Sequence, residues 1–197
     1  MKFRLFLGMN LVFGFVLSVA YLVHVNLLSV NVVFYAAITD GIIASLAVYA
    51  LLWLPFAKRF SPFEKFQMLL IWLLLGYSFA ISVPTVIDRS LSFYILEKLA
   101  QRGGGIRQDA MNDVFTKEYV KEHRLVDVRL TEQIESGTIV IKSGCVRLTE
   151  KGALLSEISR YFRRHFLPKH RLLMGKYSDD LTDPFRNSVP AGDYQCR

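Results

Sequence analysis

A single acidic residue interrupts a long apolar stretch near the middle of the first half of the chain. Asp40 lies about ten residues into the second hydrophobic run, between Thr39 and Gly41. A carboxylate at such a depth is costly in lipid and often marks a functional site. We expect Asp40 either to face the outer interface or to hydrogen-bond a neighbouring helix. The sharper alternative, a functional or partner-contacting carboxylate, makes Asp40 our candidate intramembrane polar site.

A second group of residues able to do chemistry is basic and lies near the end of the chain. An exposed helix face in water is the simplest interpretation of this cluster. Contact with anionic lipid headgroups or with a lipid-linked phosphate is the sharper one, because cationic side chains are attracted to that surface. An acidic partner protein is a third. The candidate contact residues are Arg160, Arg163, Arg164, Lys169 and Arg171, with His165 and His170 among them.

No residue set indicates a catalytic centre. The sequence lacks a nucleophile elbow, an HExxH motif and a kinase signature. The run Gly103–Gly105 has no following Lys-Ser/Thr, so it predicts a tight turn instead of a phosphate loop. The acidic residues Asp179, Asp180 and Asp183 lack the rest of a calcium-binding loop and predict a solvated patch. We therefore expect no catalytic, cofactor or metal site, and an enzyme is the less favoured class.

The two cysteines, Cys145 and Cys196, have no metal-ligand spacing. They can form one bridge if their domain lies in an oxidising compartment. Two unrelated free thiols is the interpretation that the sequence favours slightly.

The elements that must position these residues begin with a hydrophobic half. Of the chain, 52% is apolar, yet the first 87 residues carry only five basic and two acidic side chains. The apolar runs 5–28, 30–57 and 66–87 each exceed the roughly 20 residues that a helix needs to cross a bilayer. Because the backbone must satisfy its own hydrogen bonds in lipid, we expect three transmembrane helices over residues 1–87.

Loop charges set the expected orientation. The N-terminus and the connection 57–65 are basic, whereas the connection 26–31 carries no charge. Basic short loops stay in the cytoplasm, so the N-terminus is expected inside and everything after residue 87 outside. The expected location is a plasma or bacterial inner membrane.

The polar half predicts a small α+β domain over 88–170 and a polar C-terminal tail over 171–197. Apolar spacing and turn residues predict helices over 91–101, 108–123 and 126–136, with Gly137 ending the third. Alternating β-branched residues predict a hairpin of strands 138–141 and 145–148. The last helix carries Leu155, Ile158, Phe162 and Phe166 toward the expected core and ends before Pro168.

Two segments carry a resemblance to a known fold. Residues 132–139, Glu-Gln-Ile-Glu-Ser-Gly-Thr-Ile, precede the hairpin, and residues 146–152, Val-Arg-Leu-Thr-Glu-Lys-Gly, follow its turn. Together with the helix order, they make residues 89–167 resemble a winged helix-turn-helix domain. The resemblance implies a winged-helix-like fold, and it says little about function.

DNA binding is the function that a winged helix suggests first, and the charges disfavour it. The segment matching the recognition helix carries Asp127, Glu132 and Glu135 with only Arg129 as a nearby cation. Phosphate backbones repel carboxylates and are bound by Lys and Arg. The expected orientation also puts the domain outside the cytoplasm.

The sequence thus predicts an integral membrane accessory or interaction subunit. Its expected partners are the lipid bilayer, another integral membrane protein and anionic headgroups, with nucleic acid disfavoured. Two alternatives stay open: a membrane-tethered transcription regulator with a cytoplasmic winged helix, and a small transporter component that uses Asp40.

Overall fold

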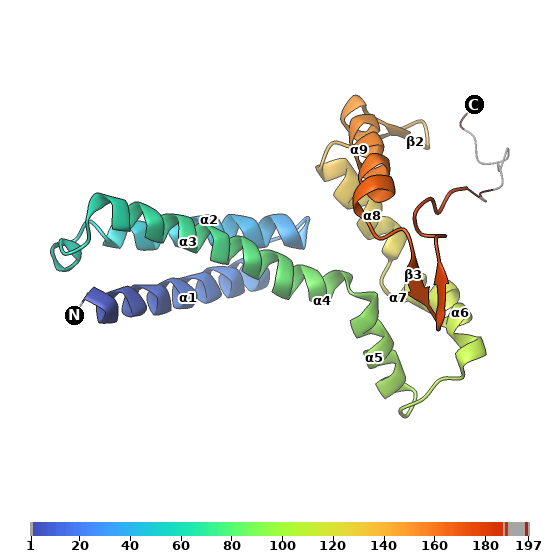
Figure 1. Cartoon of the computed structure of the whole chain (residues 1–197), viewed down its shortest axis with the longest axis horizontal. Coiled ribbons are helices and arrows are strands. Elements are labelled where there is room, and N and C mark those ends of the chain that lie inside the picture. The colour runs from blue at the N-terminus through green and yellow to red at the C-terminus, as the bar shows by residue number, and fades with distance from the viewer. Residues whose placement is uncertain (1, 187, 189–195, 197) are drawn as a thin grey trace. The chain divides into compact units, whose positions relative to one another are not determined.

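The computed structural model describes residues 2–186, 188 and 196. The chain is mostly helical and divides into two compact units, Met1–Leu125 (unit 1) and Val126–Arg197 (unit 2). Unit 1 holds long apolar helices followed by a short polar segment, whereas unit 2 combines helices with β-hairpins (Figure 1).

Within the described residues, three helices are long and apolar enough to cross a membrane. They are α1 (Lys2–Leu27), α2 (Val33–Leu51) and the span Pro62–Arg89. The last is built from α3 (Pro62–Ala80), the π-helical turn η2 (Ile81–Thr85) and α4 (Val86–Arg89). The prediction of three helices long and apolar enough to span a membrane is confirmed.

The second helix ends earlier than predicted. The apolar run continues to residue 57, but α2 stops at Leu51 and a 3-10 turn, η1 (Pro55–Ala57), follows. Proline lacks a backbone N–H and disfavours a helical conformation in the residue before it, so Pro55 prevents the helix from continuing. Ser61 and Glu64 then form a capping box around Pro62, which starts α3.

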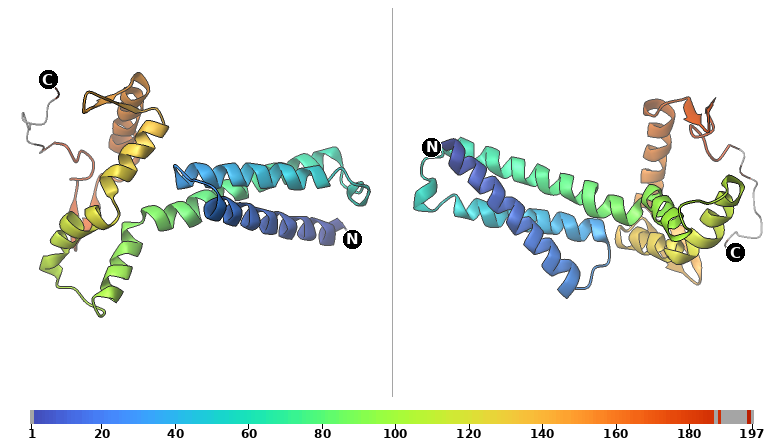
Figure 2. Two further views of the ribbon diagram at one scale, coloured as in Figure 1. Left: turned by 180° about the vertical axis from the view of Figure 1, so that it is seen from behind. Right: turned by 90° about the horizontal axis from the view of Figure 1, so that it is seen from below.

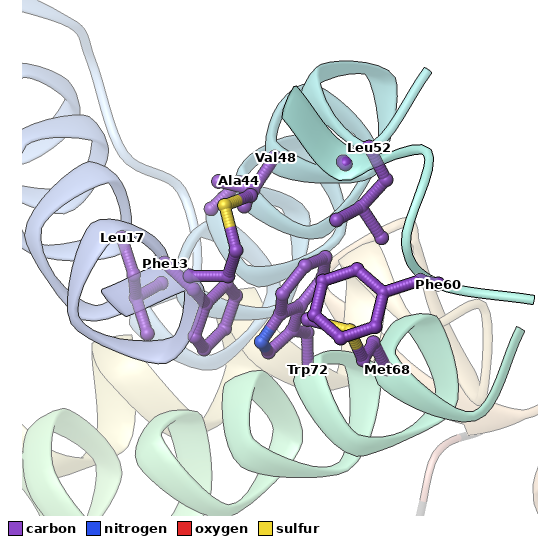
Figure 3. Close-up of a cluster of buried hydrophobic side chains, with 10 residues drawn as sticks. Phe13, Leu17, Ala44, Val48, Leu52, Phe60, Met68 and Trp72 are labelled. Carbon is purple, nitrogen blue, oxygen red and sulfur yellow. The ribbon is translucent and has the colours of Figure 1, made fainter. Parts of the chain in front are cut away.

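The three helices lie side by side in every view (Figures 1 and 2). The N-terminus and the α2–α3 connection lie at the same end of this bundle, where Lys2 Nζ is 3.1 Å from Glu64 Oε1. At its centre, Trp72 is fully buried and stacks on Phe13 with ring centroids 5.8 Å apart (Figure 3). The Trp72 indole N–H donates to Asn10 Oδ1 at 3.1 Å, so a polar contact also joins α3 to α1.

Two glycines let α2 and α3 approach closely. A Cβ placed on Gly41 would lie 3.1 Å from the Gly76 Cα, and the reverse distance is 3.0 Å. Small residues at helix crossings are the usual device for packing in membranes, where apolar side chains gain nothing by leaving lipid. The crossing therefore depends on both positions remaining without side chains.

The polar segment of unit 1 forms a small folded module. Helix α5 (Leu91–Gln101) ends at Gly103 and Gly104, both with positive φ. A helical stretch follows, made of η3 (Gln108–Ala110), α6 (Met111–Asp113), the π-helical η4 (Val114–Tyr119) and α7 (Val120–Glu122). Tyr94, Val114 and Tyr119 form its buried core. These elements match the predicted helices 91–101 and 108–123 apart from the π-helical turn.

Unit 2 contains the predicted hairpin and its flanking helices. Helix α8 (Leu125–Glu135) ends at Gly137, whose φ is 68°. Strands β1 (Ile139–Lys142) and β2 (Cys145–Leu148) pair antiparallel, with Ile139 opposite Leu148. Helix α9 (Glu150–Phe166) follows, and the short strands β3 (Arg171–Leu173) and β4 (Lys176–Ser178) then form a second hairpin. No strand was predicted in this last stretch.

A core is what the described part of unit 2 lacks. None of its apolar side chains from Val126 onward is buried, and Thr138 and Gly152 are its only buried residues. The predicted core side chains of α9 are exposed instead, with 53% for Ile158, 52% for Phe162 and 65% for Phe166. Among the described residues, α9 therefore buries none of these apolar side chains.

A disulfide joins Cys145 of β2 to Cys196, with the two Cα atoms 5.9 Å apart. The slight preference for two free thiols was wrong. Because the cysteines are 51 residues apart, spacing alone could not show that the chain returns to β2.

Candidate functional site

Asp40 forms a buried pair with a histidine of the neighbouring helix. Its Oδ1 lies 2.8 Å from Nδ1 of His24, in the last turn of α1. Asp40 is only 3% exposed, so of the two expected placements it has the one that bonds a neighbouring helix. His24 was missed because a polar residue at the end of a span is common. The available signal was that the two residues flank one short connection at similar depth.

The second carboxylate oxygen, Oδ2, is buried and has no hydrogen-bond partner among the residues that the structure describes. A buried ionised oxygen without a partner is costly. Chemically, the hydrogen bond between His24 and Asp40 ties α1 to α2.

The pair adjoins the close crossing of α2 and α3. Gly41, the next residue, meets Gly76, and the buried Ser45 hydroxyl donates to the Gly41 carbonyl at 2.7 Å. Helix positions around Asp40 are thus fixed from two sides, by the imidazole of α1 and by the backbone of α3.

The basic candidates only partly come together. Arg160, Arg163 and Arg164 of α9 line a groove of about 460 Å³ with the segment 182–186. Lys169 lies after the helix and Arg171 in β3, and neither lines the groove. Arg186 completes the basic lining, and sequence reasoning did not include it.

The three tail carboxylates are 35–62% exposed, as the predicted solvated patch requires, and each is also bound to an arginine. Arg186 donates to Asp179 at 2.9 Å and to Asp180 at 2.5 Å, and Arg164 donates to Asp183 at 2.8 Å. Hydrogen bonds from Arg186 lower the pKa of the Asp179 carboxyl, and those from Ser178 and Arg186 lower the pKa of Asp180. The Arg186 contacts brace the segment 179–186 internally, and the Arg164–Asp183 contact joins it to α9 as one wall of the groove.

A buried cation of α5 was not foreseen. The buried residues of this helix are Tyr94 and Lys98. The Lys98 ammonium is 2.7 Å from Glu118 and 2.5 Å from Glu122, which raises the pKa of Lys98 to about 12.

The same hydrogen bonds from Lys98 lower the pKa of both glutamates. The Tyr94 hydroxyl donates to Glu122 at 2.9 Å, and burial raises the pKa of that hydroxyl. Arg102 also donates to Glu118 at 3.0 Å, so two cations and two carboxylates are paired in this cluster, which stabilises the fold.

Comparison with known proteins finds no match: no family model, no curated protein and no solved structure is similar to this chain. Among the described residues, no group of His, Cys, Asp or Glu side chains can hold a metal ion.

Proposed function

We propose that this chain is an integral membrane interaction subunit that binds a larger membrane protein through unit 2 and its spans. The observation that carries the proposal is the exposed apolar face of α9. Leu154, Leu155, Ile158, Phe162 and Phe166 share one side of the helix, and each is at least 45% exposed. Exposed apolar patches of this kind are rare in monomers and usually mark an interface.

The spans provide a second support. Gly14 and Ser18 lie one turn apart on α1, both exposed, and a Cβ on Gly14 would meet nothing within 4 Å. Glycine inside a helix costs about 1 kcal/mol relative to alanine, and no described residue of the chain fills the space beside Gly14. A neighbouring transmembrane helix packed against this face would use it.

We also propose on which side of the membrane unit 2 lies. The charges of the short loops put unit 2 outside the cytoplasm of a plasma or bacterial inner membrane. The Cys145–Cys196 disulfide supports this placement, because disulfides persist in oxidising compartments and are rare in the cytosol.

We also propose that residues 88–170 adopt a winged-helix-like arrangement. Its support is local: Thr149 donates to the Gly137 carbonyl and caps α9, which fixes the end of α8 to the start of α9. A DNA-binding role gains no support, because Arg129, the cation in the recognition segment, is bound by Glu132 at 2.7 Å. The module is proposed for protein contact.

Site-specific photo-crosslinking in intact membranes tests the proposal. With a photoreactive residue in place of Phe162, we expect one crosslinked membrane protein, which also purifies stoichiometrically with the chain in mild detergent. The variant I158S/F166S should abolish both results. The matched control F93S/L96S, which makes the same chemical change on exposed positions of α5, should leave them intact. A purely monomeric preparation with no crosslink from α9 would overturn the proposal.

A further inference from the structure

The side of α9 opposite its apolar face lines the groove against the segment 182–186. Ser156, Ser159, Arg160 and Arg163 follow one another at helical spacing along this side. The groove measures about 460 Å³, and the opposite wall is held by the Arg164–Asp183 ion pair and by the Thr182 hydroxyl, which donates to the Lys169 carbonyl at 3.1 Å. The ion pair and the hydrogen bond therefore hold the segment 182–186 in place opposite α9.

The charges of the groove are not balanced. Arg164 and Arg186 are neutralised by Asp183 and by the pair Asp179 and Asp180. Arg160 and Arg163 form no ion pair with any residue that the structure describes. The Asp183 carboxylate also lines the groove, but it is already bound to Arg164. Two positive charges one helical turn apart are left without a counter-charge.

We propose that this groove binds a phosphate monoester, with the phosphate between the guanidinium groups of Arg160 and Arg163. A guanidinium presents two parallel N–H donors that match phosphate oxygens, and two such groups match the charge of a dianion. The hydroxyls of Ser156 and Ser159 donate to the remaining oxygens; neither has a hydrogen-bond partner within the described part of the chain.

The size of the groove decides between a bare anion and an ester. A volume of about 460 Å³ is far more than a phosphate group fills, so the site has room for the organic group attached to it. The same chemistry is offered by a soluble phosphate monoester and by the headgroup of phosphatidic acid. This site is independent of the proposed apolar contact, since the two use opposite sides of α9.

Calorimetric titration of the full chain in nanodiscs of phosphatidylcholine tests the site, with glycerol 3-phosphate as the probe. Saturable binding is expected, and the variant R160Q/R163Q should weaken it by roughly tenfold or more, as the loss of charge-assisted hydrogen bonds implies. The control K142Q/R147Q removes two charges from the first hairpin of the same unit and should leave the affinity within about twofold. Absence of saturable binding, or an equal loss in both variants, would overturn the proposal.

Two further arms sharpen the result. R160K keeps the positive charge but loses the two parallel N–H donors of the guanidinium, so weaker binding by R160K shows that the site recognises more than charge. Because R160K is a milder change than R160Q/R163Q, it also tests the site if the double variant misfolds. Nanodiscs containing phosphatidic acid identify the source. Competition with glycerol 3-phosphate assigns the site to the lipid headgroup, and undiminished binding assigns it to a soluble ester.

Discussion

At the scale of residues, the pair His24–Asp40 joins α1 to α2 by a hydrogen bond of 2.8 Å. Asp40 is buried and His24 is half-buried in the bundle, and the His24 imidazole is the hydrogen-bond partner of the Asp40 carboxylate among the described residues. Removing one partner from a buried pair leaves a polar group that nothing compensates, whereas replacing both by apolar side chains is often nearly neutral. The pair is therefore a strong constraint on which face of α1 meets α2.

A double-mutant cycle at this pair tests that constraint. H24L and D40L singly should each destabilise the bundle, H24L by about 1–3 kcal/mol because Asp40 then lacks a partner for either oxygen. The variant H24L/D40L should recover most of the loss. Thermal unfolding in one detergent measures all four proteins, and additive losses in the double variant would show that the two side chains are not coupled.

At the scale of elements, the joint between α8, the first hairpin and α9 is the best-defined part of unit 2. The Thr149 hydroxyl caps α9 by accepting from the Gly152 N–H, and Lys151 donates to the Ser136 carbonyl at 2.6 Å. A Cβ on Gly152 would lie 2.0 Å from the Thr138 carbonyl oxygen. Residues of the run Leu-Thr-Glu-Lys-Gly (148–152) thus make the contacts that join the hairpin to α9.

The substitution G152A should loosen this joint. Alanine favours a helix by up to about 1 kcal/mol, but the clash with backbone is expected to cost more, about 1–3 kcal/mol. Hydrogen exchange of the amides in β1 and the first turn of α9 should become faster. The control G105A lies in open space at a glycine without positive φ and should change little. Unchanged protection in G152A would contradict the close approach.

At the scale of the whole molecule, each unit is stabilised differently. The bundle has a buried centre around Trp72, whereas the described part of unit 2 has no buried apolar side chain and is closed by a disulfide. A cross-link over 51 residues lowers the entropy of the unfolded chain by an amount worth about 4 kcal/mol in the simplest treatment. The disulfide therefore contributes stability that a core gives other domains, and the proposed partner would cover the exposed apolar face of α9.

The disulfide and the orientation can be tested together. In membranes alkylated on isolation, Cys145 and Cys196 should resist a maleimide-polymer label until a reductant is added. Alkaline phosphatase fused after Arg197 should be active, and the variant C145S/C196S should make unit 2 more sensitive to protease. Labelling of both thiols without reductant, with an inactive fusion, would place unit 2 in the cytoplasm and restore the regulator as a candidate.

The spans, the helices and the first hairpin could be predicted from local signals in the sequence, apart from the end of α2. Apolar run length predicts a span, and turn residues such as Gly103 and Gly137 end helices wherever they stand. Asp40, a charge inside an apolar run, and Arg160, a member of a basic cluster, could also be named as candidates from the sequence.

Only the tertiary structure decided what those residues contact. Each contact joins residues of different elements: Asp40 with His24, Cys196 with Cys145, and Arg164 with Asp183. No periodic pattern in the sequence encodes such pairings. The same reason explains the exposed face of α9. Amphipathic spacing shows that one side of a helix must be covered, but the covering surface can lie in the same chain or in another one.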